Sequence, residues 1–284
     1  MTMTMTAPPA KPAGPPLVLF SWNGSELPLR LLLQDATPAF ETVLFDYSGR
    51  HPAGPAQWRG IKGQVLGAAT ECKGEIYSHL AEWLAARDTL PEYVALIDDD
   101  VLIGVAAVNQ ALHIARCTGL DVFSPALRHD SVFSHRWTLH RSHRLFHRVA
   151  WVEVMMPFYR GTLFAAGAPH YAGNVSSWGI DKYLMPTLQQ LLGLPGTAIV
   201  DAVQASHLRP ISSGQKVYRN GRTAAVEAQR MREHCIALLR ERAPGLIDSA
   251  WYRETFERRH GGGPLLRLVH GVGRHLREWL DRST

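Results

Sequence analysis

Cysteine is scarce in this sequence, and long apolar runs are missing from it. The cysteines lie far apart and form no CxxC pair: Cys72, Cys117 and Cys235. We therefore expect neither a disulfide framework nor a cysteine-ligated zinc site, and the cytoplasm is the natural compartment. No stretch reaches the roughly 20 apolar residues that a membrane-spanning helix needs. Residues 1–16 are rich in Pro, Ala and Thr and lack the apolar core of a signal peptide, so we expect a disordered leader there.

Basic residues exceed acidic ones only moderately. Lys and Arg number 30 against 25 Asp and Glu, which gives a formal net charge of +5. An excess of this size favours anionic partners such as nucleotides, phosphates or acidic membrane surfaces, without selecting one of them. The sequence has neither a dense basic stripe nor a known nucleic-acid-binding motif, so no nucleic-acid partner is expected.

Apolar runs alternate with helical patterns over the first half of the chain. The predicted strands are 17–20, 43–45, 93–97 and a short one at 121–123, and the predicted helices are 74–87 and 105–115. Strands that alternate with helices in this way are typical of a parallel sheet with crossover helices. The sequence therefore predicts an α/β fold.

The second half of the chain is less regular. We predict strands at 149–155, stopped by Pro157, and at 197–202, and an amphipathic helix at 224–239. No internal repeat is present. One domain is therefore expected over residues 17–245.

A basic helical tail is expected at 246–284. Between Pro264 and Leu280, apolar residues recur at helical spacing among arginines, although Gly271 and Gly273 each weaken a helix by about 1 kcal/mol. We expect this tail to pack onto the domain. The alternative is peripheral contact with an anionic membrane, at its inner face.

Three adjacent carboxylates, Asp98, Asp99 and Asp100, directly follow the apolar run Tyr93–Ile97. Ligands of open α/β sheets bind at the carboxyl ends of the strands, where this triplet would lie. Adjacent carboxylates repel one another unless a cation neutralises them, and Mg²⁺ or Mn²⁺ prefers oxygen ligands. The alternative is a solvated acidic turn. The apolar strand before the triplet favours a metal and phosphate site.

Further motifs follow the triplet in a fixed order. They are Ser124-Pro125-Ala126-Leu127, Asp130-Ser131 with Ser134-His135, Val152-Glu153-Val154-Met155-Met156-Pro157, Trp178-Gly179-Ile180-Asp181, and Val200-Asp201-Ala202 with His207-Leu208-Arg209-Pro210. Together with the triplet, which is similar to the DxD motif of GT-A glycosyltransferases, they resemble a glycosyltransferase-related domain family of plants and bacteria that has no assigned function. The resemblance spans roughly residues 17–210.

The resemblance implies a GT-A-like, Rossmann-like fold with a mostly parallel central sheet flanked by helices. It also implies a metal-dependent transferase that moves a sugar from a nucleotide-sugar donor to a hydroxyl of a saccharide or lipid-linked acceptor. We expect an inverting reaction in the synthesis of cell-envelope polysaccharide or glycolipid; the envelope role rests on family analogy alone.

The same resemblance implies roles for several residues. Asp98 and Asp99 would face the nucleotide-sugar, and Asp98, Asp100 and His207 would hold Mn²⁺ or Mg²⁺. Asp181 would be the base that takes the acceptor's proton, unless it is an acid favoured by a helix N-terminus.

Arg209 would pair with a phosphate, although a plain surface arginine is an equal alternative. For His207, the alternative to a metal ligand is a structural histidine.

Weaker candidates complete the predicted site. Lys62 and Lys73 flank glycine-rich segments and would reach a diphosphate, but a solvated lysine is the usual outcome for either. Asp46, at the end of the second strand, is a candidate for binding the ribose or the base. Glu153 would face away from Val152 and Val154 in a strand, where it binds the acceptor or holds a buried hydrogen bond.

A histidine-rich stretch at 129–147 interleaves with arginines. It lacks the cysteines or paired helical histidines of a zinc site, so we interpret it as an exposed surface that attracts anions. Two rival functions stay open. One is a phosphohydrolase with an Asp-x-Asp nucleophile, which Leu102 and the missing lysine motif disfavour. The other is a non-catalytic module that binds nucleotide-sugars or membranes.

Overall fold

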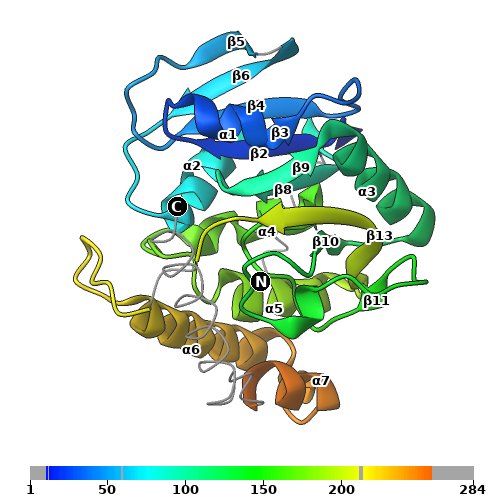
Figure 1. Cartoon of the computed structure of the whole chain (residues 1–284). Helices are drawn as coiled ribbons and strands as arrows, with labels where there is room; N and C mark the ends of the chain where they lie inside the picture. The colour runs from blue at the N-terminus through cyan, green and yellow to red at the C-terminus, as the bar shows by residue number, and fades with distance from the viewer. Residues whose placement is uncertain (1–10, 12, 59, 211–213, 258–284) are drawn as a thin grey trace, which may run out of the picture.

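A computed structural model describes residue 11 and residues 13–58, 60–210 and 214–257. The chain forms one mixed α/β domain around a curled central sheet (Figure 1). The strands are β1 Ala13–Gly14, β2 Leu17–Trp22, β3 Leu32–Leu33, β4 Glu41–Asp46, β5 Gly54–Trp58, β6 Ile61–Gly67, β7 Leu90–Pro91, β8 Tyr93–Ile97, β9 Val101–Gly104, β10 Val122–Leu127, β11 His147–Arg148, β12 Phe158–Arg160 and β13 Thr197–His207.

The α-helices are α1 Glu26–Leu31, α2 Lys73–Ala85, α3 Val105–Thr118, α4 Gly161–Tyr171, α5 Met185–Leu192, α6 Ala224–Arg242 and α7 Ala250–Tyr252. Short 3₁₀ turns occur at Arg136–Thr138 and Pro244–Leu246, and π-helical turns at Ile180–Leu184 and Arg253–Glu257. The predicted helices 74–87, 105–115 and 224–239 are confirmed as α2, α3 and α6.

The sheet runs β3-β9-β13-β10-β12-β8-β2-β4-β6-β5. The neighbours β6, β4, β2 and β8 are parallel, whereas the short β12 runs antiparallel between β8 and β10. The parallel strands therefore all end at one edge of the sheet. This edge carries Asp46 at the end of β4 and the acidic triplet directly after β8.

Alternate side chains of each central strand enter opposite cores, as the two-residue period of a strand requires. Val94 and Leu96 of β8 pack in one cluster with apolar residues of α2, α4, α5 and α6. Tyr93, Ala95 and Ile97 pack in the other, with α3. Because both faces of β8 are covered, its run of five apolar residues is buried throughout.

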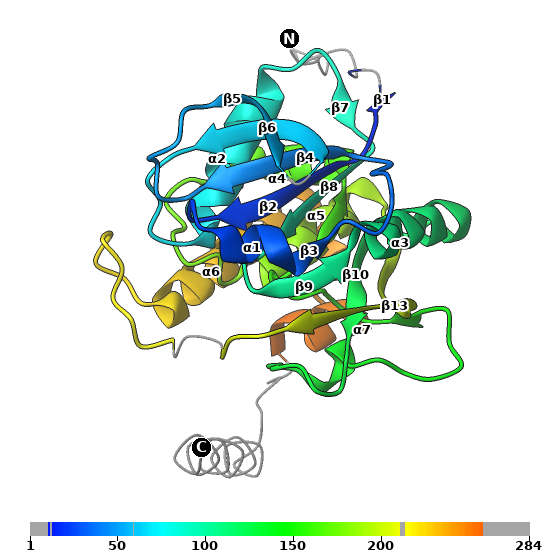
Figure 2. The same cartoon turned by 45° about the horizontal axis from the view of Figure 1, so that its top comes forward.

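Strand β9 explains how the triplet meets the end of the chain's last strand. The turn at Asp98–Asp100 reverses the chain from β8 into β9, which lies between β3 and β13 (Figure 2). Antiparallel pairing sets Val101 opposite His207, and the Leu208 N–H donates to the Asp100 carbonyl at 3.0 Å. The predicted strand 197–202 is thus longer than expected and carries His207 as its last residue.

The strand predicted at 149–155 is wrong. Residues 149–157 have no regular structure, and the strand β12 begins only after Pro157. Val152 and Met155 are buried in the two cores, so the segment needs apolar residues although it is a loop. A buried strand needs the same composition, and for this reason the sequence pattern could not tell the two apart. Its carbonyl groups serve other partners, since Pro157 accepts from Leu96 and Met155 accepts from Asp98.

Other elements were not predicted from the sequence. The antiparallel pair β5 and β6 extends the sheet beyond β4, and α4 and α5 cover one of its faces. The expected leader is partly ordered, because β1 at Ala13–Gly14 pairs with β7. Within the described residues, none of the helices is long and apolar enough to cross a membrane.

Part of the predicted tail belongs to the core. Tyr252 and Phe256 are buried in the same cluster as α6. The remainder of the tail, 258–284, lies outside the described residues, as do residues 1–10 of the expected leader.

Candidate functional site

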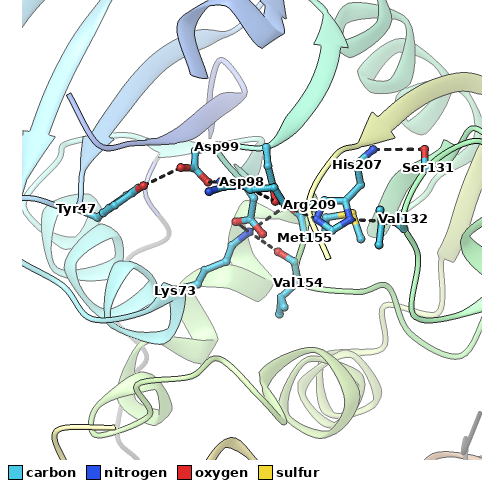
Figure 3. Close-up of polar contacts among 11 residues, drawn as sticks. Tyr47, Lys73, Asp98, Asp99, Ser131, Val132, Val154, Met155, His207 and Arg209 are labelled. Carbon is cyan, nitrogen blue, oxygen red and sulfur yellow. Dashed lines mark hydrogen bonds and ion pairs between the residues drawn. The ribbon is translucent and has the colours of Figure 1, made fainter. Parts of the chain in front are cut away.

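Lys73 is buried beneath the acidic triplet at the first position of α2. Its side chain is only 8% exposed, and its Nζ lies 2.6 Å from Asp98 Oδ1 (Figure 3). The same ammonium donates to the carbonyl oxygens of Leu96, at 3.1 Å, Val154, and Met155, at 3.2 Å. The expectation of a solvated lysine is therefore wrong for Lys73. A buried ammonium group needs such partners. Lys73 thereby links the Asp98 side chain to the backbone of the loop before β12.

The pKa of Asp98 is raised to about 6. Shielding from water is the main cause, and the charges of Asp100 and Asp99 add to it, while Lys73 opposes the rise. Ionisation of Asp98 is thus more costly than that of an exposed aspartate.

Asp99 and Asp100 are bridged by Arg209. The guanidinium group contacts Asp99 Oδ1, and its Nε lies 3.2 Å from Asp100 Oδ2. Tyr47, directly after β4, donates its hydroxyl to Asp99 Oδ2 at 2.7 Å. Arg209 is therefore not a free surface arginine, because it pairs with two carboxylates. Its side chain is 57% exposed, so it can leave these partners for another anion. Tyr47 was not predicted; its place after the strand end at Asp46 was the available signal.

His207 lies against Asp100. Its Nε2 is 3.3 Å from Asp100 Oδ2, and its Nδ1 is 2.9 Å from the carbonyl oxygen of Val132. A carbonyl can only accept, so Nδ1 carries a proton and donates it. In the neutral ring, Nε2 then points a lone pair at a carboxylate oxygen, which is favourable only when a proton or a metal ion lies between them.

The pair of Asp100 and His207 fits a shared divalent ion. Two donors that bind one ion at roughly 2.1 Å and at right angles are about 3 Å apart, close to the separation observed here. Within the described residues, however, no group of three or more His, Cys, Asp or Glu side chains converges on a metal position. The site offers the one or two protein ligands that Mg²⁺ and Mn²⁺ commonly take beside phosphate oxygens and water.

Part of the counter-charge comes from the chain itself. Lys73 and Arg209 supply two positive charges against the three carboxylates of the triplet. The triplet therefore needs an added cation less than three adjacent carboxylates alone would. One negative charge is left over when His207 is neutral.

Asp181 is the second residue of the π-helical turn Ile180–Leu184, which continues into α5. Gly179 before it has φ +89°, and a Cβ there would lie 2.8 Å from the Cβ of Met231 on α6, so only glycine fits this turn. The Lys182 N–H donates to Asp181 Oδ1 at 2.7 Å. Shielding from water outweighs the backbone N–H groups of Lys182 and Val154 and raises the pKa of Asp181 to about 6.

Glu153 lies in the same loop as the carbonyls that hold Lys73. The charges of Asp181, His207 and Asp98 all act on its carboxyl group. The strand on which its orientation was predicted does not exist, but the loop still brings it to the site. Apart from its place in a motif, Glu153 has no sequence signal that marks it.

Asp46 and Lys62 occupy other positions. The Asp46 side chain is fully buried, and its two oxygens accept from Ser48, Arg50 and His51 at 2.6–2.9 Å. It orders the loop after β4, which carries Tyr47, and presents no free oxygen. Lys62 is exposed on β6, near the end opposite to Gly67, so the structure does not bring it to the triplet.

The sequence predicts an exposed surface for the histidine-rich stretch, and this prediction is wrong for part of it. His147 is buried, with Nδ1 2.7 Å from Asp201 Oδ2 and Nε2 2.8 Å from the Trp137 carbonyl oxygen. His140 Nδ1 lies 3.0 Å from the backbone oxygen of Asp201. These contacts tie the long loop after β10 to β13.

Comparisons by sequence find nothing: no family model matches the chain, and no curated protein matches it. Solved structures do resemble it. S. aureus TarS 1–349, in complex with UDP-GlcNAc, has a TM-score of 0.52 and 11% identity, over 84% of this chain and 67% of that one. GalNAc-T7 with UDP, GalNAc and Mn²⁺ has a TM-score of 0.55 and 10% identity, over 92% of this chain and 58% of that one. At such identities the likeness shows the fold: this chain has a GT-A-like α/β fold, as the sequence predicted.

Proposed function

We propose that this protein is a metal-dependent glycosyltransferase that uses a nucleotide-sugar donor. The observation that carries the proposal is the cluster at the carboxyl edge of the sheet, where His207 lies 3.3 Å from Asp100 and the exposed Arg209 spans Asp99 and Asp100. Parallel α/β sheets bind ligands at this edge. Two neighbours of the same fold were solved with UDP-GlcNAc and with UDP, GalNAc and Mn²⁺, which supports a uridine nucleotide as the first probe.

Asp100 and His207 would hold Mg²⁺ or Mn²⁺. When bound, the ion supplies positive charge that neutralises the diphosphate and eases its departure. Asp98 is paired with Lys73. It would therefore support the ion indirectly, by holding the turn that carries Asp100. Tyr47 fixes Asp99 by its hydroxyl group.

Arg209 has a second use in this proposal. An anionic diphosphate competes with Asp99 and Asp100 for its guanidinium, whose planar fork matches phosphate oxygens. Because the side chain is 57% exposed, it can turn without opening the core. Arg209 therefore screens the carboxylates before the donor binds and pairs with the leaving group afterwards.

Asp181 would act as the base. Its carboxylate takes the proton of an acceptor hydroxyl while the hydroxyl oxygen forms a bond to the anomeric carbon. The bond between that carbon and the diphosphate oxygen breaks, and the diphosphate leaves with the electron pair. A carboxylate with a pKa of about 6 is ionised at neutral pH yet basic enough to take a proton as attack proceeds. This is an inverting displacement.

The acceptor we propose is a saccharide or lipid-linked hydroxyl compound of the cell envelope, on the family resemblance alone. Contact of the tail with an anionic membrane is part of the same proposal, and the relevant residues lie outside the described ones.

Turnover of a donor panel tests the function. Release of nucleoside diphosphate from UDP- and GDP-sugars is measured with Mn²⁺ and a mixture of methyl glycosides, and product is detected by mass spectrometry. A glycoside product that requires Mn²⁺ is expected. Phosphate release from simple phosphate esters without sugar transfer would favour the phosphohydrolase instead. Tight nucleotide binding without turnover would favour a non-catalytic module.

A further inference from the structure

Glu153 has a buried oxygen that the fold does not use. The Ser134 side chain hydrogen-bonds to its carboxyl group, but Oε2 is shielded from water and has no hydrogen-bond partner. A buried carboxyl oxygen without a partner costs stability, because it loses its contacts with water and gains none. Such a group in a native fold calls for an explanation, and a functional role is one of them.

The position of Glu153 links the two halves of the site. The next residue, Val154, gives its carbonyl to Lys73 beneath Asp98 (Figure 3), and its N–H contributes to holding the Asp181 carboxylate. Glu153 therefore lies in a short segment that contacts Lys73 below the acidic triplet and also contacts Asp181. Its carboxyl group interacts electrostatically with Asp181 and with Asp98 and His207.

Aromatic residues lie close to Ser134 and Glu153 in the sequence and pack on one another. His135 stacks on Trp137 with ring centroids 4.0 Å apart, and Trp151 meets both edge-on, at 5.0 and 5.1 Å. His135 and Trp137 are half-buried. Aromatic walls with a few placed polar groups are typical of sites for compact organic ligands, sugars among them.

We propose that Glu153 is a second carboxyl group of the acceptor site, whose free Oε2 binds a hydroxyl of a saccharide acceptor beside the hydroxyl that Asp181 deprotonates. The inference rests on the proposed glycosyl transfer and narrows the acceptor to a polyol. Burial, with the charges of Asp181 and Asp98, raises the pKa of Glu153 to about 7. Glu153 therefore keeps its proton to a higher pH than an exposed glutamate does, and the protonated form can donate to an acceptor oxygen.

Glu153→Gln tests the inference against a matched control. Glu227 is also a buried glutamate, but its oxygens accept from Val175, Ser176 and Asn220 at 2.5–3.1 Å. Its role is structural, so Glu227→Gln should lower the melting temperature. Glu153→Gln should leave the melting temperature at pH 8 unchanged or higher, because it removes a buried charge that Ser134 and His207 offset only in part.

The activity readout separates the two hypotheses. With Mn²⁺, Glu153→Gln should bind UDP as wild type does, yet transfer to a methyl glycoside should fall about 10- to 100-fold, mainly through the KM for the acceptor. If the wild type transfers sugar and Glu153→Gln does so equally well, the proposed role of Glu153 is overturned and the proposed function stands. The same holds if Glu153→Gln lowers the melting temperature as Glu227→Gln does. A wild-type protein that transfers no sugar from any donor would overturn the proposed function, and this inference with it.

Discussion

Asp181 is the residue on which the inverting reaction depends most. It stands at a turn that only Gly179 permits, and its pKa is raised to about 6 because it is shielded from water. Burial therefore makes ionisation harder than it is for an exposed aspartate, although the ionised form still predominates at neutral pH. A residue kept in this state is more readily explained by proton transfer than by helix capping.

Replacing Asp181 with Asn removes the basic carboxylate and keeps the shape. We expect transfer to fall by roughly 10²–10⁴-fold while affinity for UDP hardly changes, because the base acts on the acceptor. In the wild type, transfer should rise with pH between about 5 and 7 as the carboxylate ionises. Turnover, nucleotide affinity and melting temperature of Asp181→Asn are measured together. A stable variant with near-normal transfer would remove Asp181 from the mechanism.

Some site residues were visible in the sequence and others were not. The triplet, His207, Arg209 and Asp181 carry motif spacing that points to them. Tyr47 and the buried position of Lys73 depend on which strands are neighbours, since β4 reaches β8 only through β2. Sequence periodicity describes one element at a time, so it cannot show such cross-strand contacts.

At the scale of elements, the loop between β10 and β12 shapes one side of the site. It is fastened to β13 by His147 and Asp201, whose side chains are 3% and 0% exposed. Both ring nitrogens of His147 face acceptors, the Asp201 carboxylate and the Trp137 carbonyl. This loop also supplies Ser131 and Val132, which receive the backbone N–H and the ring Nδ1–H of His207.

Replacing His147 with Gln should loosen that fastening. Asp201 would keep only the Arg141 N–H as a partner, and loss of the imidazole at Oδ2 is expected to lower the free energy of unfolding by about 1–3 kcal/mol. Faster amide hydrogen exchange should be confined first to residues 128–148. Denaturant unfolding and hydrogen exchange measure both effects, with the exposed His113→Gln as control. Unchanged stability and unchanged exchange would show that the pair does not anchor the loop.

Elements with a clear pattern of apolar residues were predicted well. Elements that depend on contacts with distant parts of the chain were not. Helices α2, α3 and α6 have apolar residues at helical spacing over many residues, and β8 is an unbroken apolar run of five. The loop at 149–157 has the composition of a strand, but its carbonyls bind Lys73 and the Asp98 N–H in place of a ladder partner. The pair β5 and β6 contains Pro and several Gly, so its strands follow from pairing with β4 and not from local preference.

At the scale of the whole molecule, the topology brings together residues that are far apart in the chain. The turn after β8 leads into β9, β9 pairs with the end of β13, and Asp100 thereby meets His207 and Arg209 across about a hundred residues of sequence. Helix α2 brings Lys73 to the same point from below β8. The fold class was predictable from alternating strands and helices, but this meeting point was predictable only through the family resemblance.

Metal-dependent binding of the donor's diphosphate is the central claim. The most direct test is calorimetry of UDP with the full chain, first with Mn²⁺ and then with EDTA, on the wild type and on Asp100→Asn. Asp130→Asn serves as the control, since that carboxylate is 72% exposed and lies outside the cluster. We predict that UDP binds at least about tenfold more tightly with Mn²⁺, and that Asp100→Asn alone abolishes this gain, because Asp100 and His207 then no longer share an ion. Equal affinity for UDP in Mn²⁺ and in EDTA would contradict the account.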